Sequence, residues 1–170
     1  VGGAVNHVQA GDFVILPFTH GCGHCAACRA GYEGNCTSAT RGGSTGFQAE
    51  YVRYANADWS LVKIPGQPED YSDEQLDDLL ALSDVMATGY HAAFSAEVKP
   101  GDTVVVMGDG AVGLCGVLSA HLMGAKRIIA MSRHAYRQQL ALKFGATEIV
   151  AERGDEAVAK VMALTDNAGA

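Results

Sequence analysis

Four cysteines near the start of the chain have the spacing of a metal site. Two, two and seven residues separate them: Cys22, Cys25, Cys28 and Cys36. Neighbouring glycines supply the turns that let a short loop fold back on an ion. Four thiolates at about 2.3 Å from Zn²⁺ complete its tetrahedron and leave no open position. The spacing therefore predicts a structural zinc site rather than a catalytic one.

Disulfide bonds, an iron–sulfur cluster and the absence of any metal are the alternatives for these cysteines. Disulfides are disfavoured because a two-residue spacing strains the bridge and nothing in the sequence indicates an oxidising compartment. Bacterial ferredoxins share the Cys-x2-Cys-x2-Cys run, but their fourth cysteine follows after three residues and precedes proline, whereas Cys36 follows after seven and precedes Thr37. We favour zinc. The fifth cysteine, Cys115, is interpreted as a small buried hydrophobic residue.

A glycine-rich turn between an expected strand and an expected helix forms the second candidate site. Its pattern is G-x-G-x-x-G: the first glycine would make the turn, the second would let a pyrophosphate approach the backbone, and the third would let helix and strand pack closely. The helix N-terminus would face the phosphate charge. An ordinary strand-to-helix turn is the alternative. The candidate cofactor residues here are Gly108, Gly110, Ala111, Val112 and Gly113.

The next expected strand ends in Ser132 and Arg133. An NAD-binding unit places Asp or Glu at this point to bind the ribose hydroxyls. A carboxylate would repel a 2′-phosphate, whereas a hydroxyl and a guanidinium would bind it through charge-assisted hydrogen bonds. We therefore expect NADP in preference to NAD, the alternative being that Arg133 is a solvated surface charge.

The elements that must position these sites follow two different patterns. The first half reads as short extended runs between turns, over Asp12–Pro17, Gln48–Tyr54 and Leu61–Ile64. A capping box over Ser72–Gln75 then opens a helix. We expect four leucines of this region to face inward: Leu76, Leu79, Leu80 and Leu82.

Beyond Lys99 the chain alternates between strands and helices, which predicts a parallel sheet with right-handed crossovers. A helix from about Asp84 to Glu97 precedes this region. The expected strands are Thr103–Met107, Arg127–Met131 and Glu148–Val150, and the expected helices are Val112–Met123, Tyr136–Phe144 and Asp155–Leu164.

Composition excludes several classes of protein. Apolar residues make up 48% of the 170 residues and charged residues 18%, which excludes a disordered tail, and no apolar run reaches the about 20 residues of a membrane span. The formal net charge is −7 and no basic stripe is present, so neither nucleic acid nor a membrane is an expected partner. The chain starts at Val1 without a signal sequence and stops at Ala170 in mid-pattern, so we expect a fragment of a longer protein.

Four motifs together resemble the zinc-dependent medium-chain alcohol dehydrogenases: the cysteine spacing, Ser83–His91, Gly108–Gly113 and Phe144–Thr147. The resemblance implies an α/β fold. It comprises a partial GroES-like β domain over residues 1–83, with a structural zinc lobe over 20–40, and the first half of a Rossmann doubly wound parallel sheet over 84–170.

The resemblance also implies an activity, the reversible NADP-linked oxidation of an alcohol to an aldehyde or ketone by hydride transfer. In the family, a second zinc in the cleft binds the alcohol oxygen. Asp84 resembles the third protein ligand of that zinc, or alternatively caps the following helix; Thr88 and Gly89 look like residues near the nicotinamide. Ser132 and Arg133 resemble the pair found in NADP users.

The family's catalytic cysteine and its Gly-His-Glu segment have no counterpart between Val1 and Ala170. We therefore expect this chain alone to be inactive. The resemblance implies a small alcohol, aldehyde or ketone as substrate, a homo-oligomeric parent protein (dimer or tetramer) and a cytoplasmic location. Two other functions remain possible: a non-catalytic zinc-stabilised nucleotide-binding module, or a sister dehydrogenase acting on polyols, threonine or formaldehyde.

Overall fold

The computed structural model describes residues 1–38, 40–41 and 48–170. The chain divides into two compact units, Val1–Asp84 and Val85–Ala170. Within the described ranges, no helix is long and apolar enough to cross a membrane.

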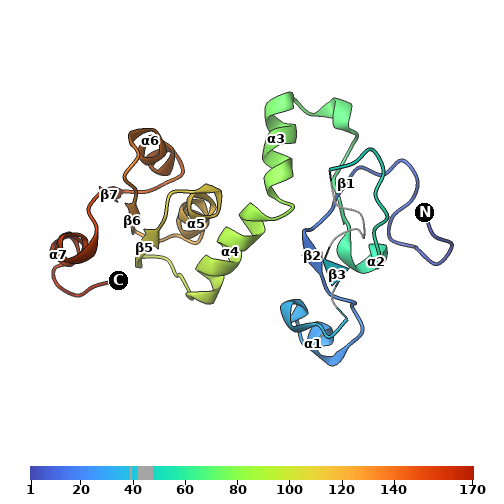
Figure 1. The fold of residues 1–170 in the computed structure, drawn as a ribbon, viewed down its shortest axis with the longest axis horizontal. Coiled ribbons are helices and arrows are strands. Elements are labelled where there is room, and N and C mark those ends of the chain that lie inside the picture. Colours follow the sequence, from blue (N-terminus) through green and yellow to red (C-terminus); the bar gives the residue numbers. More distant parts are fainter. Residues whose placement is uncertain (39, 42–47) are drawn as a thin grey trace. The chain divides into compact units, whose positions relative to one another are not determined.

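The first unit is built from short elements (Figure 1). Strand β1 (Val14–Ile15) pairs antiparallel with β4 (Val62–Lys63), and β2 (Thr19–His20) pairs antiparallel with β3 (Thr40–Arg41). Four short helical segments lie between or after these strands: α1 (Ala26–Arg29), η1 (Glu33–Asn35), α2 (Ala57–Ser60) and η2 (Pro68–Asp70). Because each strand has only two residues, the sheets alone bury little surface and the loops must be held by other contacts.

The prediction of an extended run over Gln48–Tyr54 is wrong, because residues 48–54 form bends and irregular backbone rather than a strand. Instead, the Tyr54 hydroxyl donates a hydrogen bond to the carbonyl oxygen of Pro17, and the Tyr54 ring packs against His20 with ring centroids 4.7 Å apart. Tyr54 is an aromatic residue of a type common in strands, but here it anchors a loop.

The helix after this region, α3 (Asp73–Ala81), begins as the capping box predicts. The Gln75 amide donates to the Ser72 hydroxyl oxygen at 3.3 Å, and the Ser72 amide donates to the Gln75 side-chain oxygen at 2.9 Å. The expectation that four leucines face inward is wrong for two of them, since Leu80 is 72% exposed and Leu82 is 42% exposed. The leucines of this region form an apolar stripe, but the described part of the chain leaves Leu80 and Leu82 exposed.

The second unit contains a three-stranded parallel sheet in the order β5-β6-β7, as the strand and helix alternation predicts. The strands are β5 (Thr103–Met107), β6 (Arg127–Met131) and β7 (Glu148–Val150). The register pairs Met107 with Met131 at the carboxyl ends of β5 and β6. The helices of this unit are α4 (Val85–Ser95), α5 (Ala111–Leu122), α6 (Ala135–Lys143) and α7 (Gly154–Leu164).

Helices cover both faces of this sheet (Figure 1). On one face, Val104 and Val106 pack into a cluster with buried residues of α5 and α6. On the other face, Val105 packs with Val161 and Leu164 around α7. Strand β5 is partly buried over its first four residues, and Met107 at its end is exposed.

Helix α4 approaches α5 closely at a glycine. A Cβ atom on Gly89 would lie 2.7 Å from the backbone carbonyl carbon of Cys115, a distance that real Cβ atoms do not adopt. Cys115 is buried, as predicted, and lies outside the group of four cysteines. Gly89 therefore sets the distance between the two helices.

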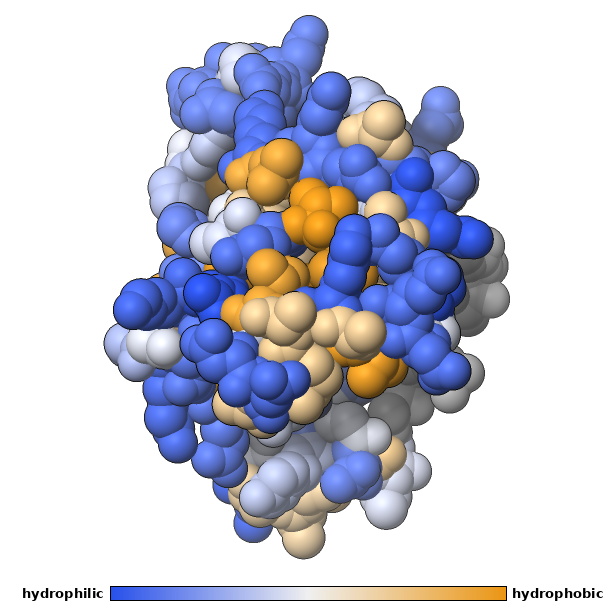
Figure 2. Space-filling view, turned by 90° about the vertical axis from the view of Figure 1, so that its left-hand side faces the viewer, coloured by the Kyte–Doolittle hydropathy of each residue, from blue (hydrophilic) through white to orange (hydrophobic). Residues whose placement is uncertain are grey.

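The second unit also exposes large apolar side chains, on several of its elements: Tyr90, Phe94, Met107, Val112, Leu122, Tyr136, Leu142 and Val158. On the face drawn in Figure 2, hydrophobic side chains gather at the centre and hydrophilic ones surround them.

Candidate functional site

The structure brings the four predicted metal ligands together. The sulfur atoms of Cys22, Cys25, Cys28 and Cys36 all lie within 4.8 Å of one another. The Cys25 sulfur is 3.5 Å from that of Cys28 and 3.8 Å from that of Cys36. A tetrahedron with zinc–sulfur bonds of about 2.3 Å has edges of about 3.8 Å, so the donor set and its spacing fit a four-coordinate zinc ion.

Two glycines allow the loop to close around these sulfur atoms. A Cβ atom on Gly21 would lie 2.6 Å from the Cys28 sulfur. Gly23 has a φ of +80°, and a Cβ atom there would lie 2.7 Å from the indole ring of Trp59. Larger residues would therefore clash with a ligand at the first position and with the packed ring at the second.

Backbone amides stabilise negative charge on the sulfur atoms. The amides of Cys22 and Ser38 each donate to the Cys36 sulfur at 3.3 Å, and the Cys25 amide donates to the Cys22 sulfur at 3.4 Å. A hydrogen bond from the backbone of Cys28 is the main cause that lowers the pKa of the Cys25 thiol to about 6, whereas burial raises the pKa of the Cys28 thiol to about 11. Four thiolates therefore need a bound cation to exist together.

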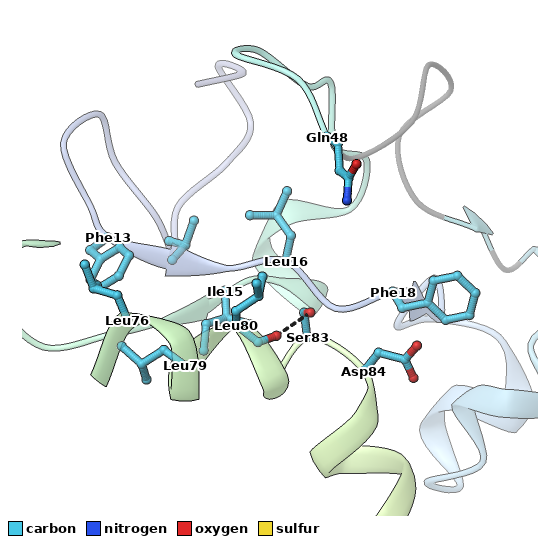
Figure 3. Close-up of a pocket in the computed structure, with 11 residues that line it drawn as sticks. Phe13, Ile15, Leu16, Phe18, Gln48, Leu76, Leu79, Leu80, Ser83 and Asp84 are labelled. Atoms are coloured by element: carbon cyan, nitrogen blue, oxygen red, sulfur yellow. Dashed lines mark hydrogen bonds between the residues drawn. The ribbon is translucent and has the colours of Figure 1, made fainter. Parts of the chain in front are cut away.

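Asp84, the predicted ligand of a catalytic zinc, lies apart from the cysteines. It is exposed at the end of the first unit and lines a cavity of about 520 Å³ (Figure 3). The other walls come mainly from apolar residues of β1 and α3, and the Ser83 hydroxyl beside Asp84 donates to the Leu80 carbonyl oxygen at 2.7 Å. Among the described residues, no group of three candidate ligands includes Asp84. Its zinc role stays a prediction.

The glycine-rich turn has the strand–turn–helix context that its pattern predicts. Gly108 has a φ of +116°, and a Cβ atom on Gly113 would lie 2.3 Å from the Gly108 carbonyl oxygen, so α5 packs directly onto the turn. A Cβ atom on Gly110 would meet nothing within 4 Å. Ala111 and Val112 follow as the first residues of α5. The open space over Gly110 at a helix N-terminus fits the approach of a pyrophosphate.

The other predicted cofactor residues differ in exposure. Ser132, directly after β6, is fully buried, and its hydroxyl donates to a carboxylate oxygen of Asp109 at 2.9 Å. Arg133 and Thr88 are exposed. Their contacts with a cofactor stay predictions.

Sequence reasoning missed two residues at this end of the sheet, Asp109 and Arg137. The Arg137 guanidinium donates to the second carboxylate oxygen of Asp109 at 3.1 Å, while Ser132 holds the first. The hydrogen bond from Ser132 is the main cause that lowers the pKa of Asp109, and Arg137 lowers it further. The sequence contained a signal for both residues: Asp109 is an acid inside the glycine turn, and Arg137 follows Arg133 by four residues.

Two family profiles match the chain. Residues 1–66 match the alcohol dehydrogenase GroES-like domain, and residues 111–170 match the zinc-binding dehydrogenase profile. These two regions lie in the first and second units, respectively.

Known dehydrogenases are similar in sequence to most of this chain. The glutathione-independent formaldehyde dehydrogenase of Pseudomonas aeruginosa is 40% identical over 141 residues, which are 76% of this chain and 35% of that protein. The NADP-dependent isopropanol dehydrogenase of Clostridium beijerinckii is 33% identical over 99% of this chain and 48% of that protein.

A solved structure shows the same fold. The alcohol dehydrogenase of Thermus sp. ATN1 has a TM-score of 0.83 and 31% identity, over 98% of this chain and 48% of that one. The chain thus spans less than half the length of each of these three proteins. The cysteine cluster, the glycine-rich turn and both matching regions lead to one conclusion: the chain belongs to the zinc-dependent medium-chain alcohol dehydrogenase family.

Proposed function

We propose that this chain is part of a zinc-dependent alcohol dehydrogenase that prefers NADP and interconverts a small alcohol with its aldehyde or ketone. The observation that carries the proposal is the carboxyl edge of the sheet in the second unit. There the open glycine turn and the end of β6, which leads into Ser132 and Arg133, lie on neighbouring parallel strands. This edge is where doubly wound sheets bind dinucleotides.

Each part of the chain has a role in this proposal. The four cysteines hold a structural zinc ion that keeps the loop of the first unit folded. The turn at Gly108–Gly113 receives the pyrophosphate, while Ser132 and Arg133 bind the adenosine ribose and its 2′-phosphate. Thr88 lies near the nicotinamide.

Asp84 is a ligand of the catalytic zinc in this proposal, together with ligands from outside this chain. When bound, the zinc polarises the alcohol oxygen and the nicotinamide accepts the hydride. The part of this chain that contacts the substrate includes the cavity beside Asp84, whose mostly apolar walls suit a small organic molecule.

The experiment compares the whole parent protein with the isolated 170-residue chain. The parent is expected to oxidise small alcohols with NADP faster than with NAD and to contain zinc. The isolated chain is expected to hold about one zinc ion and to show no turnover. A parent that binds neither dinucleotide contradicts the proposal, as does turnover by the isolated chain. A parent that binds nucleotide tightly but turns over no alcohol supports a non-catalytic binding module instead.

Formaldehyde is a second candidate substrate, because the formaldehyde dehydrogenase of P. aeruginosa is 40% identical to this chain. Assays with formaldehyde and with isopropanol in parallel separate the two candidates, since relatives of this chain are named for each of these compounds. We also propose that the parent is a cytoplasmic homo-oligomer, which size-exclusion chromatography with light scattering and fractionation would test. Neither nucleic acid nor a membrane belongs to its proposed partners.

A further inference from the structure

A carboxylate occupies the end of β6, where the sequence alone shows no acid. It belongs to Asp109, the second residue of the glycine turn, and not to the strand itself. Met107 and Met131 are paired in the parallel register, so the turn after β5 and the residue after β6 emerge beside each other. The Ser132 hydroxyl consequently reaches the Asp109 carboxylate at 2.9 Å.

Other contacts fix Ser132 in place, and Arg137 is positioned by its helix. The Ser132 amide donates to the Val150 carbonyl oxygen at 3.1 Å, and the Ser132 carbonyl oxygen accepts from the Gln138 side chain at 2.8 Å. Arg137 belongs to the first turn of α6 and contacts Asp109 at 3.1 Å. The Asp109 side chain is 15% exposed and that of Arg137 is 49% exposed, so the charge pair lies at the surface edge where a ligand can reach it.

This arrangement changes the expected recognition of the adenosine ribose. The Ser132 hydroxyl is fully buried and its proton is donated to Asp109, so the Asp109 carboxylate is the acceptor that a ligand meets at this point. A free ribose 2′-hydroxyl can donate to that carboxylate. A 2′-phosphate is repelled by the carboxylate and attracted by the guanidinium groups of Arg133 and Arg137.

We propose that Asp109 and Arg137 set the selectivity between NADP and NAD, in opposite directions. Asp109 weakens binding of the 2′-phosphate and supports the free 2′-hydroxyl. Arg137 neutralises Asp109 and attracts the phosphate. Arg133 and Arg137 carry two positive charges against the single negative charge of Asp109, so the site favours NADP, although less strongly than it would without Asp109. The inference rests on the proposed dinucleotide function.

The test measures the dissociation constants of NADPH and NADH, by their fluorescence, for the whole parent protein and its variants. Asp109→Asn keeps the shape of the side chain and an oxygen that accepts from Ser132, but removes the charge. It is expected to raise the preference for NADPH over NADH by about fivefold to tenfold. Arg137→Gln is expected to lower that preference by a similar factor, and Arg137→Lys to restore part of it.

Competition by 2′-AMP and 5′-AMP locates the effect on the 2′-phosphate. Matched controls are Glu156→Gln, an exposed acid on α7, and Arg153→Gln, an exposed arginine before α7; both should leave the preference unchanged. If Asp109 has a purely structural role, Asp109→Asn weakens the binding of NADPH and of NADH by the same factor. An unchanged ratio of the two dissociation constants would therefore overturn the inference. If the unmutated protein binds neither dinucleotide, the proposed function itself fails.

Discussion

The indole ring of Trp59, in α2, lies against Gly23 of the cysteine loop, so close that a Cβ atom on the glycine would be 2.7 Å from the ring. Trp59 is the only tryptophan in the chain. Its environment is therefore coupled to the loop that holds the four cysteines, and its fluorescence should report the state of this loop.

Removal of zinc is expected to shift the Trp59 emission to longer wavelength, because the loop loses its central ion and the ring becomes more exposed to water. The measurement is a chelator titration followed by emission spectra and metal analysis, with recovery after zinc is returned. If metal analysis shows that the zinc has been removed and the Trp59 emission is unchanged, the coupling is contradicted.

Substitution of one cysteine ligand should remove the metal. Cys36→Ser is expected to lower the zinc content from about one ion per chain to well below one half, because three thiolates leave the tetrahedron open. Elemental analysis after dialysis checks this, and Cys115→Ala is the matched control, because Cys115 is buried outside the group. Equal zinc content in both variants would rule out the assigned ligands.

The glycines of the turn should respond differently to alanine. Gly113→Ala is expected to destabilise the fold by about 2 kcal/mol, because its Cβ atom would lie 2.3 Å from the Gly108 carbonyl oxygen. Gly110→Ala should change stability by less than about 0.5 kcal/mol, because the position is open, yet weaken dinucleotide binding by filling the space of the pyrophosphate. Urea unfolding and dinucleotide titration separate the two effects; similar loss of stability in both variants would refute the distinction.

The hydrogen bond from Ser132 should be visible in the titration of Asp109. This bond lowers the pKa of Asp109 below its ordinary 3.8, so the carboxylate is charged at neutral pH. Its contribution to stability is present above the ordinary pKa and is lost as the pH falls through the lowered value. Ser132→Ala should raise the Asp109 pKa towards 3.8, measured by carbon NMR of the carboxyl group. An unchanged pKa would show that the bond does not form in solution.

The stability of the second unit should depend on Ile128, which is fully buried in the hydrophobic cluster that packs against α5 and α6. Ile128→Ala is expected to reduce the free energy of unfolding by about 2–5 kcal/mol, because it leaves a cavity in a packed core. The exposed residue Leu122, at the end of α5, supplies the control, since Leu122→Ala should have a much smaller effect in the same urea titration.

Local patterns in the sequence determined the cysteine group, the capping box before α3, the glycine turn and every strand and helix of the second unit. Such features depend on residues a few positions apart, whose spacing and conformational preferences can be read directly. The irregular backbone over residues 48–54 escaped prediction, because aromatic anchoring and strand pairing produce similar short patterns.

Only the tertiary structure decided which side chains meet across the sheet. Asp109 and Ser132 are 23 residues apart, and the parallel register of β5 and β6 makes them neighbours. The exposure of Leu80 was likewise decided by which elements cover α3, not by its position in the helical stripe. Spacing along the chain determines what one element presents, whereas contacts between elements depend on packing and register, which no single segment encodes.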